Sequence, residues 1–170
     1  MSEILGAMRG DAEIRIVPVD GPQMLETARG LFAEYWDSFG FTPCFQNFGE
    51  ELAGLPGKYA PPDGRLAVAW AGGERDGEAA GCVALRRFDE RRCEVKRLYV
   101  RPAYRGYRLG RRLLEWVMAE ARAAGYREML GDTMPVMTDA LALYDRMGFE
   151  RTAAYADQEQ SGAIAIRIRL

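Results

Sequence analysis

The chain of 170 residues contains no histidine. A zinc site with histidine ligands is therefore excluded, and so are Ser-His and Cys-His nucleophiles, because the imidazole that would activate the hydroxyl or thiol is missing. Any general base in a catalytic site must be another side chain, and a carboxylate is the natural candidate.

Cysteine is scarce as well. The three cysteines, Cys44, Cys82 and Cys93, are an odd number and lie far apart, which is not the pattern of a disulfide-rich secreted domain. We expect reduced, partly buried thiols in a cytoplasmic protein. Since no basic partner accompanies Cys93, its thiol is expected to be inert as a nucleophile.

Long hydrophobic runs are missing. No apolar stretch approaches the length of about 18 residues that a membrane-spanning helix needs. The N-terminal residues also lack the apolar region of a secretory signal. These absences lead us to expect a soluble protein without a membrane partner.

No charge of one sign dominates, since 23 basic residues stand against 25 acidic residues for a net charge of −2. This balance argues against a general nucleic-acid binder, although a module that uses a local arginine cluster remains an alternative. Arginines do crowd residues 86–112. Those at 86–92 are interpreted as a solvated face, whereas those at 101–112 would attract a polyanionic ligand.

Composition and patterning predict one α/β domain, because 48% of the residues are hydrophobic and can form a core. Residues 1–12 show no periodicity and are expected to be a disordered N-terminus, followed by a single domain over residues 13–170. Alternating apolar residues predict strands, and apolar residues spaced by three and four predict helices. The expected strands are 13–19, 65–71, 78–87, 93–100, 126–133 and 163–170, and the expected helices are 23–39, 49–55, 109–125 and 135–147.

Residues 95–114 form the most informative stretch. A strand pattern ends at Arg101-Pro102, a basic turn with Gly106 and Gly110 follows, and an amphipathic helix begins at once. Glycines let backbone N–H groups approach a ligand closely, and the helix dipole adds attraction for an anion. The turn therefore predicts a phosphate or pyrophosphate site, with an ordinary strand-to-helix connection as the alternative. A Walker loop is excluded because no Gly-Lys-Ser/Thr follows.

The turn resembles that of the GNAT N-acetyltransferases, whose pattern is Arg/Gln-x-x-Gly-x-Gly/Ala. Here the pattern reads Arg105-Gly106-Tyr107-Arg108-Leu109-Gly110, so an arginine replaces its middle glycine. Residues 93–102 resemble the fourth strand of that family, and residues 143–149 resemble its Leu-Tyr-x-x-x-Gly-Phe segment. Met137 departs from the family, many members of which have asparagine there.

The resemblance implies a mixed, mostly antiparallel sheet of about six to seven strands with flanking helices. It also implies acetyl-coenzyme A as cosubstrate, bound where the fourth and fifth strands separate, and no metal. The pantetheine arm would pair with the backbone of Leu98, Tyr99 and Val100. The pyrophosphate would bind the turn, whose expected contact residues are Arg105, Gly106, Tyr107, Arg108, Leu109, Gly110 and Arg111.

The chemistry of amide formation from a thioester, together with the resemblance, suggests three roles. Glu94, on the strand beside the thioester, would take a proton from the acceptor amine, directly or through water. The N–H of Leu98 would stabilise the oxyanion, and Tyr144 would protonate the departing thiolate. The alternatives are a Glu94 that pairs with a neighbouring arginine on the strand face and a Tyr144 that packs in the core.

The resemblance places the acceptor site against the first helical hairpin. Its expected lining is Phe41, Phe45, Gln46 and Phe48, with packing of a loop on the core as the alternative. The acidic tail at 155–162 is expected to border this pocket and would suit a cationic acceptor. We expect a primary amine on a small molecule or peptide, and a homodimer stays open because relatives often dimerise. A coenzyme A-binding or sensing domain without turnover is the alternative function.

Overall fold

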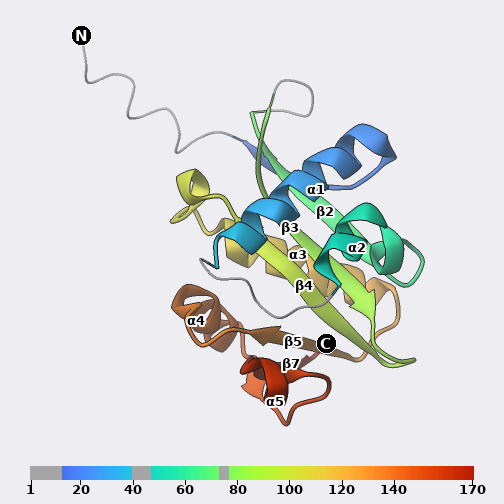
Figure 1. Cartoon of the computed structure of the whole chain (residues 1–170), viewed down its shortest axis with the longest axis vertical. Coiled ribbons are helices and arrows are strands. Elements are labelled where there is room, and N and C mark those ends of the chain that lie inside the picture. Colours follow the sequence, from blue (N-terminus) through green and yellow to red (C-terminus); the bar gives the residue numbers. More distant parts are fainter. Residues whose placement is uncertain (1–12, 40–46, 73–76) are drawn as a thin grey trace.

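The computed structural model describes residues 13–39, 47–72 and 77–170, and these build a seven-stranded sheet in the order β1-β2-β3-β4-β5-β7-β6 (Figure 1). The predicted α/β fold and strand number are confirmed. The disordered start predicted for residues 1–12 lies outside the described residues. The elements are β1 Ile14–Pro18, α1 Gly21–Asp37, α2 Phe48–Ala53, β2 Arg65–Ala71, β3 Glu78–Arg87, β4 Arg92–Val100, α3 Leu109–Ala123, β5 Glu128–Thr133, α4 Thr138–Arg146, β6 Glu150–Arg151, α5 Gln158–Ser161 and β7 Ile164–Arg169, with single 3-10 turns at Gly57–Tyr59 and Pro102–Tyr104.

Helices cover both faces of the sheet (Figure 1). On one face α1 buries Leu31 and Phe32 against Val68 of β2. On the other face α3 buries Leu113 and Val117 in a cluster that also contains Ala67. Because side chains alternate along a strand, β2 supplies one face from even positions and the other from odd positions.

The pairing of β4 with β5 is the only parallel pairing among the described strands, and it is short. The two strands are in register from Arg92↔Glu128 to Glu94↔Leu130. Beyond those pairs neither strand, both described in full, registers with the other. The edge of β4 that faces β5 therefore presents backbone groups from residue 95 onward to a ligand.

A bulge in β4 lies beside this separation. Lys96 pairs with Ala84 and Tyr99 pairs with Cys82, so one more residue of β4 than of β3 fits between the two pairs. Arg97 adopts a φ of 57° at this point. The bulge shifts the alternation of β4, so that Tyr99 packs with the α1 face whereas Leu98 packs against the α3 face.

The strand boundaries follow the prediction closely, and the helix boundaries differ. The helix predicted over 23–39 is α1, which begins at Gly21 with Pro22 in its first turn. The helix predicted from residue 135 begins at Thr138, because a turn closed by the bond from Met137 N–H to the Met134 carbonyl precedes it. The two-residue β6 and the four-residue α5 were not predicted, since elements that short leave no periodicity.

The two described cysteines, Cys82 and Cys93, are free and buried. Burial raises the pKa of the Cys93 thiol to about 12, which agrees with the expectation that this thiol is inert. None of the helices in the described part of the chain has the length and apolar character to cross a membrane.

Candidate active site

The turn before α3 has the geometry of an anion site. Helix α3 begins at Leu109, and its N-cap residue, Arg108, makes no side-chain capping hydrogen bond. The first backbone bond of the helix runs from Arg112 N–H to the Arg108 carbonyl. The N–H groups of Leu109, Gly110 and Arg111 thus precede the intrahelical ladder, at the positive end of the helix dipole. These residues fit the phosphates of coenzyme A.

Two residues of the turn adopt left-handed backbone conformations. Gly106 has a φ of 88°, and Arg108 has a φ of 59° and a ψ of 17°. Arg108 thus holds the conformation that a glycine adopts without strain, at the position where the GNAT pattern has glycine. The substitution keeps the backbone path of the turn and adds an exposed cation beside the N–H groups.

We expect Arg108→Gly to stabilise the fold by about 1 kcal/mol, because glycine relieves the left-handed strain of this position. Coenzyme A affinity should be retained, since the N–H groups keep their places. The free energy of unfolding in urea is the measurement. The matched control is Arg105→Gly, because Arg105 has an ordinary φ of −73° and should gain nothing. An equal effect at both positions would count against strain at Arg108.

The predicted pantetheine residues lie along the open edge of β4. Leu98 lines a small cavity, about 30 Å³, between the separated ends of β4 and β5. The ring of Tyr99 packs on the α1 face, with its centre 5.9 Å from that of the Tyr35 ring. Tyr99 can therefore contact a ligand at the open edge of β4 only through its backbone. Arg105 Nε donates to the Val100 carbonyl at 3.0 Å, which ties the end of the strand to the turn.

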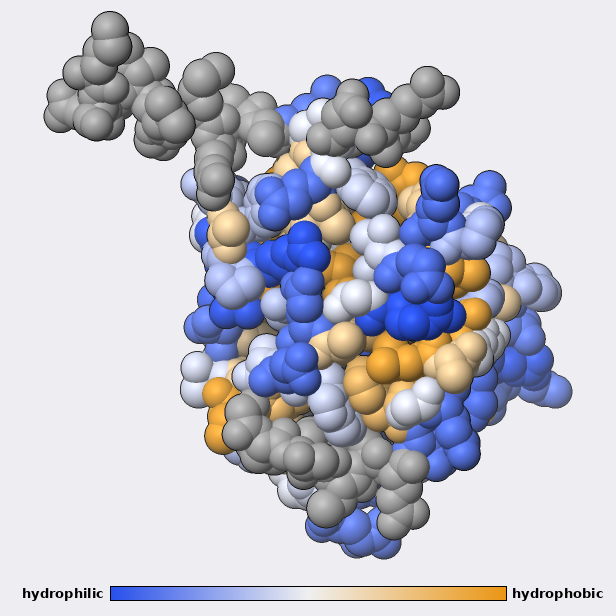
Figure 2. Space-filling view, turned by 45° about the horizontal axis from the view of Figure 1, so that its top comes forward, coloured by the Kyte–Doolittle hydropathy of each residue, from blue (hydrophilic) through white to orange (hydrophobic). Residues whose placement is uncertain are grey.

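A larger cavity of about 470 Å³ opens on the α1 face of the sheet, between the helical hairpin and the C-terminal segment. Phe48, one of the residues predicted for the acceptor site, lines this cavity, and so does Asp157 of the acidic tail. The other three residues predicted for the acceptor, Phe41, Phe45 and Gln46, lie outside the described residues. Both apolar and charged residues form the wall, and Figure 2 shows hydrophobic and strongly hydrophilic surface side by side on one face of the molecule.

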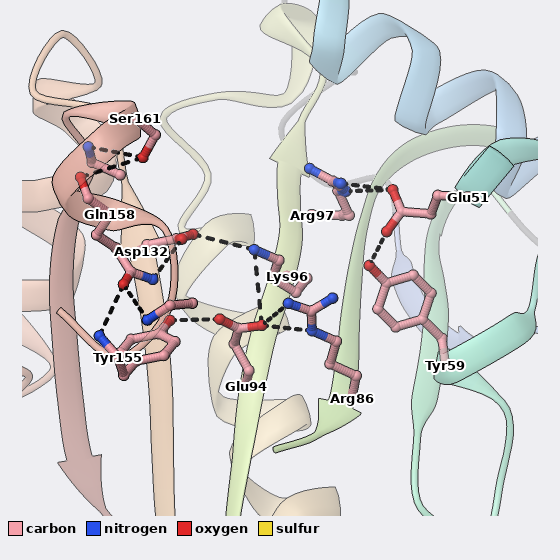
Figure 3. Close-up of polar contacts among 12 residues, drawn as sticks. Glu51, Tyr59, Arg86, Glu94, Lys96, Arg97, Asp132, Tyr155, Gln158 and Ser161 are labelled. Atoms are coloured by element: carbon pink, nitrogen blue, oxygen red, sulfur yellow. Dashed lines mark hydrogen bonds and ion pairs between the residues drawn. The ribbon is translucent and has the colours of Figure 1, made fainter. Parts of the chain in front are cut away.

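Glu94 is almost completely buried, with 1% of its surface exposed. Its Oε1 accepts from Arg86, whose Nη2 lies at 2.6 Å, and its Oε2 accepts from the hydroxyl of Tyr155 at 2.6 Å (Figure 3). Lys96 Nζ lies 3.8 Å from Oε1. The carboxylate is therefore an ion-paired group behind the cavity, and neither cavity has it among the described residues of its wall.

A second carboxylate, that of Asp132, belongs to the walls of both cavities. Lys96 Nζ lies 3.3 Å from its Oδ1, and Gln158 Nε2 donates to its Oδ2 at 3.2 Å. Gln158 is buried, and its Oε1 accepts the backbone N–H groups of Tyr155 and Ala156. One amide side chain therefore fixes the C-terminal segment to β5, as Figure 3 shows.

A third polar cluster closes the other side of the cavity. Arg97 donates through Nε and Nη2 to Glu51 Oε2 at 3.0 and 2.6 Å, and Tyr59 donates its hydroxyl to the other oxygen of Glu51 (Figure 3). The Arg97 guanidinium lies 5.4 Å from the centre of the Phe48 ring, which stacks on Trp36. These contacts join α2 to β4 and position Phe48 in the cavity wall.

Tyr144 is buried in α4 and lines the small cavity between the separated strands. Its ring lies 5.0 Å from that of Phe149, so it also packs in the core. Burial raises the pKa of Tyr144, and the nearby Asp132 carboxylate adds to the effect. The phenol therefore keeps its proton at neutral pH, as a proton donor must.

Buried phenols should make the fold sensitive to alkali. Desolvation raises the pKa of Tyr35 to about 12, whereas an unfolded tyrosine titrates at about 10. Because the pKa is higher in the folded state, the protonated Tyr35 side chain stabilises the fold fully below pH 10, and this stabilisation is lost between pH 10 and 12. Urea midpoints measured across this range should fall, and Tyr35→Phe should make the fall shallower. Identical slopes in the two proteins would contradict this assignment.

Several residues of the site were not predicted from the sequence. Asp132, Lys96, Arg97 and Glu51 reach the cavity only after the sheet and hairpin are assembled, and Arg86 was assigned to a solvated face. Their chain positions differ by as much as 81 residues, from 51 to 132. The one signal for Lys96 and Arg97 was their place beside Glu94 on the central strand. No group of three or more potential metal ligands occurs in the described part of the chain.

A helix start with free N–H groups, a separated strand pair and an adjoining cavity would suit the transfer of a group from a phosphate-bearing carrier to an acceptor. A model of the Acetyltransferase (GNAT) family matches residues 28–149. The chain belongs to this family and is an N-acetyltransferase by class. Members of the family use acetyl- or acyl-coenzyme A as cosubstrate and act on small-molecule or peptide acceptors.

Individual proteins agree with the family. The chain is 36% identical over 164 residues to the uncharacterized N-acetyltransferase C1271.07c of Schizosaccharomyces pombe, and the aligned residues cover 96% of this chain and 99% of the relative. It is 30% identical over 138 residues to the uncharacterized N-acetyltransferase YjgM of Escherichia coli, and the aligned residues cover 80% of each chain. A solved acetyltransferase of Streptococcus agalactiae shares the fold, with a TM-score of 0.74, 18% identity, and 92% of this chain and 98% of that chain covered.

Proposed function

We propose that this chain transfers the acetyl group of acetyl-coenzyme A to a primary amine by direct attack of the amine on the thioester. The observation that carries the proposal is the junction of the two cavities. The small cavity between the separated ends of β4 and β5 shares wall residues with the larger cavity on the α1 face. A thioester held along β4 and an amine held in the larger cavity would meet there.

The chemical step forms a C–N bond and breaks a C–S bond. An amine that resembles lysine has a pKa of about 10.4, so at pH 7 only about one molecule in 2,500 is unprotonated. The amine must lose a proton before or during attack, and the sulfur leaves with the electron pair of the broken bond. We assign Glu94 as the base that accepts the proton of the amine and Tyr144 as the acid that donates a proton to the thiolate.

Burial makes Glu94 an indirect base. Its carboxylate lies behind the cavity, with Arg86 and Tyr155 on its two oxygens. In this proposal the proton of the acceptor passes through a water molecule to Glu94.

The main-chain bulge supports the assignment of the oxyanion site. Arg97 takes its left-handed φ immediately before Leu98, and Leu98 lines the cavity between the strands. We assign the N–H of Leu98 to the developing oxyanion, where a preoriented donor is most effective. Tyr144 lies in the wall of the same cavity and would give its proton to the sulfur.

A thiol-release assay tests the proposed function. Purified protein is mixed with acetyl-coenzyme A and a panel of amino acids, polyamines, aminosugars and arylalkylamines, and free coenzyme A is followed with a thiol reagent. We expect amine-dependent release for at least one class, with the acetylated amine identified by mass spectrometry. Binding of coenzyme A without release for any amine would favour the sensing domain, and salt-dependent binding to duplex DNA would favour the nucleic-acid module.

A further inference from the structure

We propose that the last two residues of β5 divide the substrates between them, with Asp132 binding the acceptor nitrogen and Thr133 binding the thioester end of the carrier. This inference rests on the proposed function and concerns the same site. Its basis is the placement, burial and hydrogen bonding of these two neighbouring side chains.

The two cavities share six wall residues among those described, and any transfer between a carrier and an acceptor must take place beside them. Asp132 is the only carboxylate of the six. The shared residues are Tyr35, Lys96, Arg97, Asp132, Thr133 and Met137.

Asp132 is available to a cationic group. Among the described residues each of its oxygens has one partner, Lys96 or Gln158, and a carboxylate oxygen can accept more than one hydrogen bond. Its side chain keeps 17% of its surface exposed, whereas that of Glu94 keeps 1%. Gln158 holds one oxygen, so the carboxylate is oriented before the acceptor arrives.

The neighbouring charges permit an ammonium group at Asp132. Arg97 is compensated by Glu51, and Arg86 is compensated by Glu94. Lys96 lies within 4 Å of two carboxylates, 3.3 Å from Asp132 and 3.8 Å from Glu94. A cationic acceptor at Asp132 would therefore shift Lys96 toward Glu94 and would not leave it without a partner.

Thr133 serves the other face of the strand. Adjacent residues of a strand point to opposite faces, and a Cβ on Gly131 would meet Val95 and Ile166 of the cluster under α3. Thr133 therefore points to the face where Leu98 and Tyr144 pack. Thr133 is 6% exposed, and its Oγ1 has no hydrogen-bond partner among the described residues. No other buried side-chain oxygen or nitrogen in the described part of the chain lacks a partner. Such an atom is costly unless a ligand satisfies it.

Two isosteric variants separate the substrates kinetically. The probe amine is the panel member that wild-type protein acetylates fastest. Asp132→Asn should raise the KM for this amine about tenfold to a hundredfold, the value of a charge-assisted hydrogen bond, and leave the KM for acetyl-coenzyme A within about twofold. Thr133→Val should raise the KM for acetyl-coenzyme A about fivefold and leave the KM for the amine within about twofold. Asp139→Asn, an exposed residue of α4 outside both cavities, is the matched control and should change neither.

An experiment without any amine tests the placement itself. Asp132→Cys and Asp139→Cys are incubated with acetyl-coenzyme A alone, and acetylation of the introduced thiol is read by mass spectrometry against wild-type protein. We expect acetylation at position 132 and none at position 139, because only the first lies at the junction. No acetylation at 132 despite normal coenzyme A binding, or a KM for the amine that Asp132→Asn leaves unchanged, would overturn the inference. If wild-type protein does not bind coenzyme A, the proposed function itself is refuted.

Discussion

Glu94→Gln is expected to lower kcat by about a hundredfold or more, the usual contribution of a general base. Glutamine keeps the size of the side chain and can still accept from the Tyr155 hydroxyl, but it cannot take a proton. The ascending limb of the pH-rate profile should disappear, and the dissociation constant for acetyl-coenzyme A should hardly change. An unaltered pH-rate profile would show that Glu94 is not the base.

A control for stability is needed because the substitution also breaks an ion pair. Removing one partner of a buried pair costs about 3 to 5 kcal/mol, and less is expected here because water reaches part of Arg86. The Arg86 side chain is 30% exposed and that of Glu94 is 1% exposed. Tyr155→Phe is the matched variant, since it removes a hydrogen bond to Glu94 and keeps both charges. It should lower kcat by less than about tenfold, because Glu94 keeps its charge and can still take a proton.

Tyr144→Phe is expected to lower kcat by about a hundredfold at pH 7 while acetyl-coenzyme A still binds. The ring keeps its contact with Phe149, so the variant removes only the hydroxyl. The coenzyme A thiol should have a pKa near that of cysteine, about 8.5, so the thiolate leaves more easily without a proton as the pH rises. The defect should therefore shrink above that pH.

The control for Tyr144 is a buried tyrosine in another place. Tyr126 is 7% exposed and donates its hydroxyl to the Asp63 carbonyl, outside both cavities. Tyr126→Phe should leave kcat unchanged at every pH, even if it lowers the unfolding midpoint. Normal turnover by Tyr144→Phe, or equal losses in the two variants, would reject the role of Tyr144 as the acid.

Local signals in the sequence were enough to predict the framework. The alternation in 65–71 and 78–87 and the helical spacing of Leu109, Leu113 and Val117 depend on neighbours in the chain, and these elements are confirmed. The turn at 105–110 could be recognised because its glycines and its position between strand and helix are local as well. The arginine at position 108 departs from the family pattern, and only the backbone angles show that it adopts the glycine conformation.

The polar interior of the site could not be predicted in this way. Glu94 and Arg86 are eight positions apart, and their pairing follows from the register of β3 with β4, which places the two residues opposite each other. Asp132 and Gln158 meet only because β7 pairs with β5, which brings α5, the helix before β7, beside the end of β5. Sequence patterns predict which face a residue occupies, and they do not tell which charged groups from other strands share that face.

The most direct measurement is a calorimetric titration of the purified, folded protein with acetyl-coenzyme A. The central claim is that main-chain N–H groups of the turn and of the first residues of α3 bind the diphosphate, so that the acetyl group lies between the separated ends of β4 and β5. We predict a saturable heat of binding with one site per chain, abolished by Gly106→Val, because valine is strained at the φ of 88° that Gly106 adopts. No saturation at acetyl-coenzyme A concentrations of about 1 mM would contradict the claim.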